Sequence, residues 1–496
     1  MGIIRKQSIY SSIFIYIGFA IGAVNILILF PKYFTTEQFG LTRLLLDVSL
    51  LFSTVSTFAT VPVTYKFYPF YNSYLPRKKN DLPFLTSLAA TIGCFLLLTL
   101  ITIFKDYIVR KFGERSPLFV THYALLYPLT ISLTFFSLFE AYAWSLHKTI
   151  LTNFLREVVF RIIVLLVMLM YAFNFFSFET FLSLYSLVYL PSALILLFFL
   201  IKSGKFPINF SISDVTKRLY RKIVSFGLFI FSGSVLNVMS RTIDLIIISS
   251  QSAGGLSDAG VFAIATYMIQ IMEVPQRSIV AIAIPIISQA WKDRNMKQIS
   301  ELYKKTSLNL LIFGLAIWGA LLLNMDNAIT FLGPAYEPAK MIVIIMGTAK
   351  IIDLGTGLNS QILLLSKYWR IDFITNMLFV LISIPLNYTL INHYGVIGSA
   401  FANLIALTVF NSIRFFYIWK LYKMQPLTVQ TIYALLIALI CFGVTAIIPS
   451  FPNLFIDVAV KAIVYVGLFG SAILFFKVSE DLNGLFTQTL QRLKSR

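Results

Sequence analysis

Four pairs of oppositely charged residues lie inside long apolar stretches of this sequence. The members of each pair are three or four residues apart, so on a helix they share one face and can pair with each other. Charged side chains are costly in hydrocarbon and usually face a partner or a cavity. Neutralisation for membrane insertion is one explanation, and a functional site is the other. The pairs are Glu157 with Arg161, Arg241 with Asp244, Glu273 with Arg277, and Lys350 with Asp353.

Two arginines favour a functional site for some of these charges. Arg156 and Arg414 have no acidic residue three or four positions away, and Arg156 projects about 140° from Arg161 on a helix. A guanidinium group stays charged and binds two phosphate oxygens at once, so a cluster of arginines in a membrane-spanning cavity suits a phosphate. The first apolar stretch, 9–30, contains no acidic residue, which argues against a site for organic cations.

The elements that must position these residues are membrane-spanning helices. About 20 apolar residues at 1.5 Å rise cross a hydrocarbon core of about 30 Å. Hydrophobic residues make up 58% of the chain, charged residues 12%, and the mean hydropathy is +0.83. We predict fourteen crossings near 9–30, 41–66, 84–105, 118–139, 152–173, 180–201, 223–248, 259–290, 305–325, 338–362, 371–391, 396–418, 428–449 and 455–477.

The basic residues predict the orientation of the chain. If the N-terminus is inside, about 25 of the 40 Lys and Arg fall in inner segments and about 5 in outer loops. The positive-inside rule then places both termini in the cytoplasm. The net charge of +19 is explained by this topology and by anionic membrane lipid as a partner, so we expect no nucleic acid binding.

The sequence offers no pattern for a metal site or a cofactor. Cys94 and Cys441 both lie in predicted crossings, and the three histidines have no metal-ligand spacing. The outer loops are short, and 106–117 is the most highly charged of them. A transporter is therefore expected rather than an enzyme.

A faint internal repeat predicts the domain organisation. TEQFGLTRLL (36–45) resembles SDAGVFAIAT (257–266), and Gly40 then aligns with Gly260. Six crossings per copy give two lobes of the same orientation, with substrate between them. The predicted domains are 1–202 (helices 1–6), 203–222 (cytoplasmic linker), 223–420 (helices 7–12) and 421–496 (helices 13–14 and tail). Amphipathic helices are expected within 202–222, 291–304 and 478–496, the first with a capping box at Ser211–Asp214.

Three segments resemble a known family. GVIGSAFANL (395–404) resembles its G-x-x-G-x-A stretch opening helix 12, NVMSRTIDLIIISSQSAGGLSDAG (237–260) resembles the end of its helix 7, and FLGPAYEPAK (331–340) resembles its loop before helix 10. Together with a plan of six, six and two helices, the chain resembles the polysaccharide transporter, or O-antigen flippase, branch of the MOP (MATE-like) superfamily. The resemblance implies an all-α polytopic fold with two six-helix lobes in a V and two extra C-terminal helices.

The resemblance also implies a function. A flippase of this branch moves undecaprenyl-diphosphate-linked oligosaccharide, the repeat unit of O-antigen, capsule or exopolysaccharide, across the bacterial cytoplasmic (inner) membrane by alternating access. Its partners would be the polyprenyl-diphosphate-linked glycan, H+ or Na+ as coupling ion, and glycan polymerase machinery. The candidates for substrate contact are Arg156, Arg161, Arg277, Lys350 and Arg414. Glu157, Glu273 and Asp353 are candidates for ion coupling or partner charges, and Arg241 with Asp244, the family's helix 7 aspartate, for a structural pair.

Three alternatives remain open from the sequence. A multidrug or cation exporter of the same fold is opposed by the acid-free first helix. A lipid II flippase would need much the same site chemistry. A membrane-embedded oligosaccharide polymerase or ligase would need a catalytic external loop, and 106–117 resembles a solvated connector.

Overall fold

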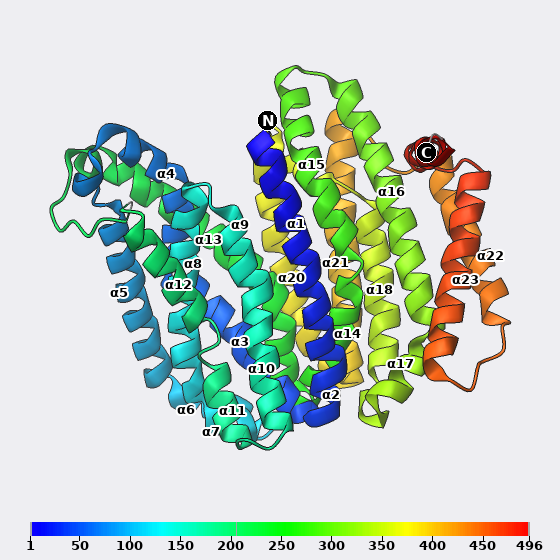
Figure 1. Cartoon of the computed structure of the whole chain (residues 1–496), viewed down its shortest axis with the longest axis horizontal. Helices are drawn as coiled ribbons and strands as arrows, with labels where there is room; N and C mark the ends of the chain where they lie inside the picture. The colour runs from blue at the N-terminus through cyan, green and yellow to red at the C-terminus, as the bar shows by residue number, and fades with distance from the viewer. Residues whose placement is uncertain (1, 205, 495–496) are drawn as a thin grey trace. The chain divides into compact units, whose positions relative to one another are not determined.

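The structure is a computed structural model that describes residues 2–204 and 206–494. Every regular element in these residues is helical. Eleven helices in this part of the chain are long and apolar enough to cross a membrane, and thirteen if each of two bent pairs counts as one crossing. The bent pairs are Leu256–Gln270 with Glu273–Lys292 and Pro334–Gly355 with Asn359–Leu365. The predicted all-α polytopic architecture is therefore confirmed (Figure 1).

The crossing predicted at 152–173 is helical but is not among these thirteen. It forms as α9 (Thr149–Asn153), a π-helical turn η4 (Phe154–Val159) and α10 (Phe160–Ala172). Three charged residues, Arg156, Glu157 and Arg161, interrupt its apolar stretch. π-helical turns inside α-helices are rare and are frequent at functional sites.

The chain divides into two compact units, Met1–Gly260 (unit 1) and Val261–Arg496 (unit 2). The lobe boundaries predicted from the repeat stay a prediction. Besides α9, η4 and α10, unit 1 contains α1 (Gly2–Ala23), η1 (Val24–Leu29), α2 (Phe30–Tyr33), α3 (Thr36–Ser56), α4 (Thr60–Tyr74), η2 (Arg77–Lys79), α5 (Leu82–Ile103), α6 (Lys105–Phe112), α7 (Pro117–His122), η3 (Tyr123–Leu125), α8 (Leu126–Ser145), α11 (Phe178–Tyr185), α12 (Leu190–Lys202) and α13 (Asp214–Gln251).

Helix α14 (Leu256–Gln270) begins in unit 1 and continues into unit 2. Unit 2 further contains α15 (Glu273–Lys292), α16 (Met296–Leu323), α17 (Met325–Leu332), η5 (Pro334–Tyr336), α18 (Ala339–Gly355), α19 (Asn359–Leu365), α20 (Trp369–Tyr394), α21 (Val396–Tyr422), α22 (Val429–Ala446), α23 (Leu454–Phe475) and α24 (Glu480–Lys494).

Helix α3 is the central element of unit 1. Its start is fixed by a capping box in which Thr35 and Gln38 each bond the other's backbone N–H. Its side chains Phe39, Leu41 and Leu44 are completely buried, and the helix packs against α5, α8 and α13. The helix ends near Phe58 and Ala59, whose positive φ angles of 42° and 59° break it before α4 begins.

The two glycines of the predicted repeat meet each other. A Cβ atom built on Gly40 of α3 would lie 1.8 Å from the carbonyl oxygen of Leu256 and 2.9 Å from the backbone nitrogen of Gly260. A Cβ atom on Gly260 would lie 2.2 Å from the carbonyl oxygen of Thr36. A hydrogen bond of 2.6 Å between the hydroxyls of Thr36 and Ser257 closes the same contact. Only glycine at both positions lets α3 and the first turn of α14 approach this closely.

The segment before α13 differs from the amphipathic linker helix predicted within 202–222. Helix α13 runs unbroken for 38 residues, about 57 Å at 1.5 Å per residue, so it extends well beyond the hydrocarbon core. Its cap is Ser213 rather than Ser211, because Asp81 fixes the helix start. The Asp81 carboxylate accepts hydrogen bonds from the Ser213 N–H (2.8 Å) and the Thr216 hydroxyl (2.7 Å).

The two other predicted amphipathic segments are helical. Residues 296–304 form the first turns of α16, whose N-terminus is capped by the Asn295 side chain. The predicted tail helix is α24, and its first turn is held on α16 by the Asn309 side chain, which donates to Asp481 (2.8 Å) and accepts from Ser479 (2.7 Å). Figure 1 shows α24 nearly end-on beside the upright α22 and α23.

Small residues control the packing of α20 and α21. Gly395 has a φ of 59° and separates the two helices. A Cβ atom on Gly398 would lie 2.1 Å from the carbonyl oxygen of Leu390. The Ser399 hydroxyl donates to the Asn387 side chain (2.7 Å), so the pair is joined by a buried hydrogen bond as well as by close packing.

We predict that Gly40→Val lowers the stability of the protein by about 1–3 kcal/mol, because the added side chain overlaps the backbone of α14. Thermal unfolding of the detergent-solubilised protein measures the effect. The control is Gly443→Val in α22, where a Cβ atom has open space within 4 Å. Equal melting temperatures for the two variants would contradict the close approach.

Candidate functional site

Unit 1 contains a cavity of about 480 Å³ lined by both polar and apolar side chains. Its walls come from α3, the break after α3, α4, α8, η4 and α13. Serine, threonine and asparagine side chains and one aromatic ring surround an ion pair. The polar residues of the lining include Ser53, Thr57, Tyr65, Ser137, Glu140, Arg156 and Asn237.

The ion pair in this cavity joins two helices. An Arg156 guanidinium nitrogen from η4 lies 2.7 Å from a Glu140 carboxylate oxygen on α8. The Arg156 side chain is 43% exposed, whereas the Glu140 side chain is 4% exposed. The guanidinium carbon lies 5.8 Å from the centre of the Phe136 ring, within reach of a cation–π contact. A guanidinium has five N–H donors, so this pair leaves donors for a ligand in the cavity.

The predicted Glu157–Arg161 pair also forms, at 2.5 Å. It is tied to α1, because the Asn25 side chain donates to the Arg161 carbonyl (3.0 Å) and a Cβ atom on Gly18 would lie 2.3 Å from the Glu157 carbonyl. Asn25 belongs to the π-helical turn η1, which packs against α10, and the preceding helix α1 packs against η4. The backbone of η4 and α10 that carries the pair is thus held against α1 and η1.

Unit 2 contains a connected group of charges on α15 and α18. Lys350 lies 3.3 Å from Glu273 and 2.9 Å from Asp353, so one ammonium group serves two carboxylates. Arg277 lies 3.3 Å from Glu273, and its side chain is 60% exposed. The predicted pairs Glu273–Arg277 and Lys350–Asp353 therefore both form, and Lys350 links them.

The Asp353 carboxylate is bonded on its other side by amides. Gln276 and Asn411 donate to it at 3.5 and 3.3 Å. The Asn411 side-chain oxygen in turn accepts from Asn359 (2.8 Å) and Thr356 (3.1 Å). The break between α18 and α19, where Gly357 has a φ of 61°, brings these two residues to Asn411. This network joins α15, α18, α19 and α21.

Arg414 has a partner on a neighbouring helix. Its guanidinium forms an ion pair with Asp372 of α20 and donates to the Thr375 hydroxyl (3.0 Å). Its guanidinium carbon lies 3.7 Å from the centre of the Phe410 ring, and its side chain is 4% exposed. The Asp372 carboxylate also accepts from Ser360 (2.9 Å) and Asn376 (3.2 Å). The group is a closed, buried pair.

The remaining predicted pair lies on α13. Asp244 is buried, at 7% exposure, and Arg241 is exposed. The structure therefore gives these two residues of one helix different surroundings.

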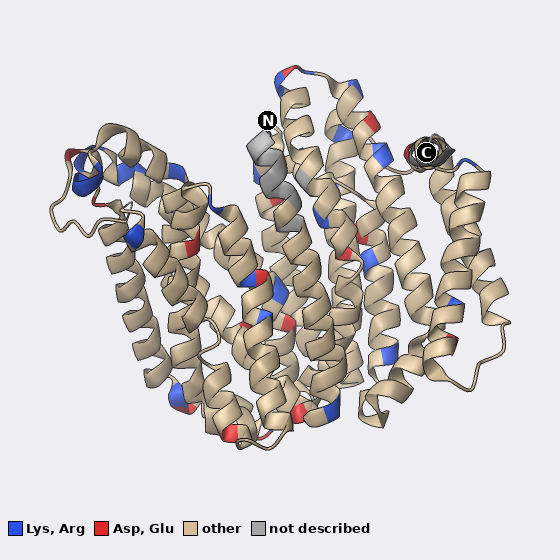
Figure 2. Cartoon of the chain, viewed as in Figure 1, with Lys and Arg blue, Asp and Glu red and all other residues tan. Residues whose placement is uncertain are grey.

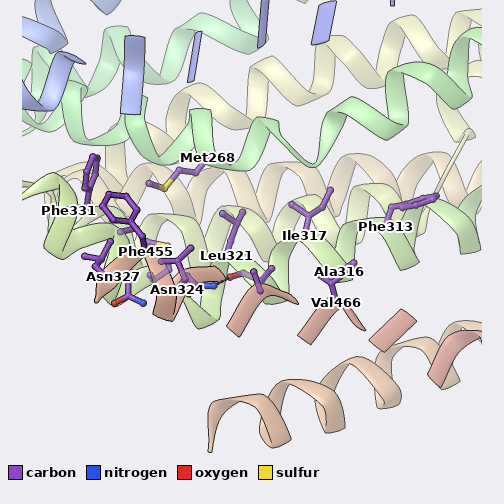
Figure 3. Close-up of a pocket in the computed structure, with 16 residues that line it drawn as sticks. Met268, Phe313, Ala316, Ile317, Leu321, Asn324, Asn327, Phe331, Phe455 and Val466 are labelled. Atoms are coloured by element: carbon purple, nitrogen blue, oxygen red, sulfur yellow. Dashed lines mark hydrogen bonds between the residues drawn. The ribbon is translucent and has the colours of Figure 1, made fainter. Parts of the chain in front are cut away.

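Unit 2 also contains an apolar cavity of about 630 Å³ among α14, α16, α17 and α23. Figure 3 shows the rings of Phe331 and Phe455 near one end of the cavity, where their centres are 6.2 Å apart. Asn324 and Asn327 line the same end, and Asn327 donates to the Asp457 carboxylate (2.5 Å). A cavity with this lining suits hydrocarbon rather than a sugar or a phosphate.

Sequence reasoning missed the two acidic partners, Glu140 and Asp372. Both lie at the ends of predicted crossings, 118–139 and 371–391, where a charged residue is usually taken for an interfacial one. Spacing along one helix gives no information on partners from another helix. The sequence signal that remained was the lack of an acid one turn away from Arg156 and Arg414.

The described chain resembles solved structures of membrane transporters. It matches the lipid II flippase MurJ in an inward closed conformation with a TM-score of 0.76 at 16% identity, covering 94% of this chain and 98% of that one. It matches an inward-facing multidrug resistance MATE family transporter of the MOP superfamily with a TM-score of 0.63 at 14% identity, covering 84% and 94%. A MATE transporter from Vibrio cholerae gives a TM-score of 0.54 at 12% identity, covering 85% and 96%.

This chain has the same fold as these transporters. No protein-family model and no curated protein sequence matches it. Identities of this size show the fold alone and carry no information on the substrate. The part of the predicted resemblance that concerns fold is therefore confirmed, and the O-antigen branch stays a prediction.

We predict that Asp372→Asn destabilises the protein by about 3–5 kcal/mol, because it leaves the buried Arg414 guanidinium without a counter-charge. The melting temperature in detergent measures the effect. Asp326→Asn is the control: this carboxylate pairs with Lys340 but is 85% exposed, so its loss changes stability by less than about 1 kcal/mol. Similar melting temperatures for the two variants would argue against a structural role for the Arg414 pair.

Proposed function

We propose that this chain is a flippase for polyprenyl-diphosphate-linked oligosaccharide in the bacterial inner membrane. The observation that carries the proposal is the cavity of unit 1, where Arg156 is the exposed member of its ion pair and Glu140 the buried one. A ligand that enters this cavity meets a guanidinium first. A diphosphate offers the paired oxygens that a guanidinium binds best.

The lining of the cavity also suits a glycan attached to the diphosphate. Hydroxyl and amide side chains such as Ser53, Ser137 and Asn237 can exchange hydrogen bonds with sugar hydroxyls. The Tyr65 ring, whose centre lies 5.8 Å from that of the Trp144 ring, offers an apolar face of the kind that sugars stack on. The polyprenyl tail would stay in lipid.

The exposed fractions of the predicted cations suggest different roles for them. Arg156 and Arg277, 43% and 60% exposed, are our candidates for direct contact with the diphosphate or an acidic sugar. Lys350 and Arg161, 13% and 24% exposed, would hold the neighbouring carboxylates in place. Arg414, 4% exposed, would serve as a fixed pair within unit 2.

The carboxylates Glu157, Glu273 and Asp353 remain our candidates for coupling to H+ or Na+. Asp353 is the strongest of them, because it shares Lys350 with Glu273 and is bonded by two amides that can reorient. Exchange between states open to either side would then be biased by which carboxylate holds the ammonium group.

Both termini would lie in the cytoplasm. Figure 2 shows basic residues gathered at the end of unit 1 where α4 ends and α13 begins.

A multidrug or cation exporter is the second candidate, and the likeness to a MATE transporter supports it. Its substrates would need an accessible carboxylate. In the unit 1 cavity the carboxylate is buried and the guanidinium is exposed, which favours an anionic substrate.

A polymerase or ligase would need a catalytic external loop. The segment considered for that role, 106–117, forms the short helix α6 and the turn before α7.

Deletion of the gene tests the proposed function. We expect the complete undecaprenyl-linked unit to accumulate on the inner side and one surface glycan to be lost. Unchanged glycans with altered sensitivity to cationic compounds would contradict the flippase and support the exporter. Translocated but unpolymerised units would support a transferase.

We predict that Arg156→Gln or Arg277→Gln, restored to the deletion strain, lowers glycan export about tenfold or more, because each removes a charge-assisted contact to phosphate. Surface glycan and inner-leaflet lipid-linked glycan are measured together, at matched protein levels. Arg110→Gln is the control, since this exposed side chain bonds only the Asp106 carbonyl of its own helix in the described structure. Full export by both site variants would exclude these residues from the site.

A further inference from the structure

The two oxygens of the Glu140 carboxylate have different surroundings. One Glu140 oxygen lies 2.7 Å from Arg156. The other oxygen is buried and accepts no hydrogen bond from the described residues. The carboxylate therefore holds the guanidinium by one oxygen rather than by the stronger two-oxygen arrangement. Such a contact is easily exchanged for a ligand with two or more phosphate oxygens.

The groups around Glu140 leave Arg156 as its counter-charge. Among the described residues, Arg156 is its ion-pair partner within 4 Å. The other titratable groups that act on this pair are Glu157 from η4, Tyr65 from α4 and Tyr189 at the start of α12. Arg161 acts on Tyr189 but is itself paired with Glu157. When a ligand takes Arg156, no second cation among the described residues lies within 4 Å of Glu140 to replace it.

An arginine within a membrane-spanning helix needs a counter-charge during the time between the release of one substrate molecule and the binding of the next. An unpaired guanidinium in a low-dielectric region is costly, and so is an unpaired buried carboxylate. An empty site therefore needs an internal anion for Arg156. When the substrate is bound, that internal anion must release Arg156.

We propose that Glu140 is an internal competitor that occupies Arg156 in the empty site and is displaced by the diphosphate of the substrate. The substrate's identity rests on the proposed function, but the exchange itself requires only an anion with phosphate oxygens. Glu140 thereby sets the affinity of the site and prevents Arg156 from being left unpaired. It is a specificity-determining residue of the same site, one that acts on the ligand through Arg156.

Removal of the Glu140 charge should change anion affinity in the opposite direction from removal of a residue that contacts the ligand directly. Glu140→Gln keeps the shape of the side chain and removes its negative charge, so an anion no longer has to displace it. We expect binding of inorganic pyrophosphate to become roughly tenfold tighter, within the usual range of coupling between two ligands at one protein. Arg156→Gln, and the double variant Glu140→Gln with Arg156→Gln, should both bind pyrophosphate more weakly than the wild type.

The experiment is a calorimetric titration of inorganic pyrophosphate into the full-length protein in lipid nanodiscs, at fixed pH and ionic strength. Glu157→Gln is the matched control: it removes a carboxylate of the same unit that pairs with Arg161 rather than Arg156. Tighter binding in Glu140→Gln and not in Glu157→Gln supports the proposal. Unchanged or weaker binding in Glu140→Gln, an equal gain in both variants, or no pyrophosphate binding by any variant overturns it.

A second variant covers the case in which Glu140→Gln does not yield folded protein. Glu140→Asp keeps the charge and withdraws it from Arg156 by one methylene group, so pyrophosphate binding should again tighten. Wild-type affinity in this variant would overturn the proposal. This experiment and the test of the proposed function address separate claims. The lipid-linked glycans of the deletion strain identify the substrate, whatever Glu140 does. The titration tests whether Glu140 competes with phosphate for Arg156, whichever glycan is transported.

Discussion

A charged side chain inside a membrane needs a counter-charge within reach, and much of this structure depends on that constraint. The three contacts Arg156–Glu140, Lys350–Glu273 and Arg414–Asp372 each join two different helices. Breaking such a pair without a replacement partner leaves an uncompensated charge, so each contact holds together the two helices that carry it. The charged residues thus act as cross-links within each unit as well as candidate ligands.

The same constraint separates structural charges from available ones. Asp372 is saturated by Arg414, Ser360 and Asn376, and the Arg414 guanidinium is covered by Phe410. One Glu140 oxygen accepts no hydrogen bond from the described residues, and Arg156 opens into a cavity. A saturated pair can only be broken at a large energetic loss. An unsaturated pair can exchange partners, which is the property that a transport site needs.

The sequence predicted those features that depend on neighbours along the chain. The apolar runs gave the helical membrane architecture, and spacing of three or four residues gave the contacts Glu157–Arg161, Glu273–Arg277 and Lys350–Asp353. It could not give Glu140 or Asp372, because partners on different helices follow from packing and leave no periodic signal. The cap of α13 was misplaced by two residues for a similar reason: the acceptor that fixes it, Asp81, comes from a distant loop.

The paired glycines Gly40 and Gly260 have a consequence for the history of the chain. If the repeat arose by duplication, each copy brought its own glycine, and the two glycines now pack against one another's helices. Neither glycine could then be substituted alone, since a side chain at Gly40 would collide with the backbone of α14 and a side chain at Gly260 with the backbone of α3. Natural selection would act on this contact as a single unit, so the oldest trace of the duplication should survive here while the surrounding residues diverge.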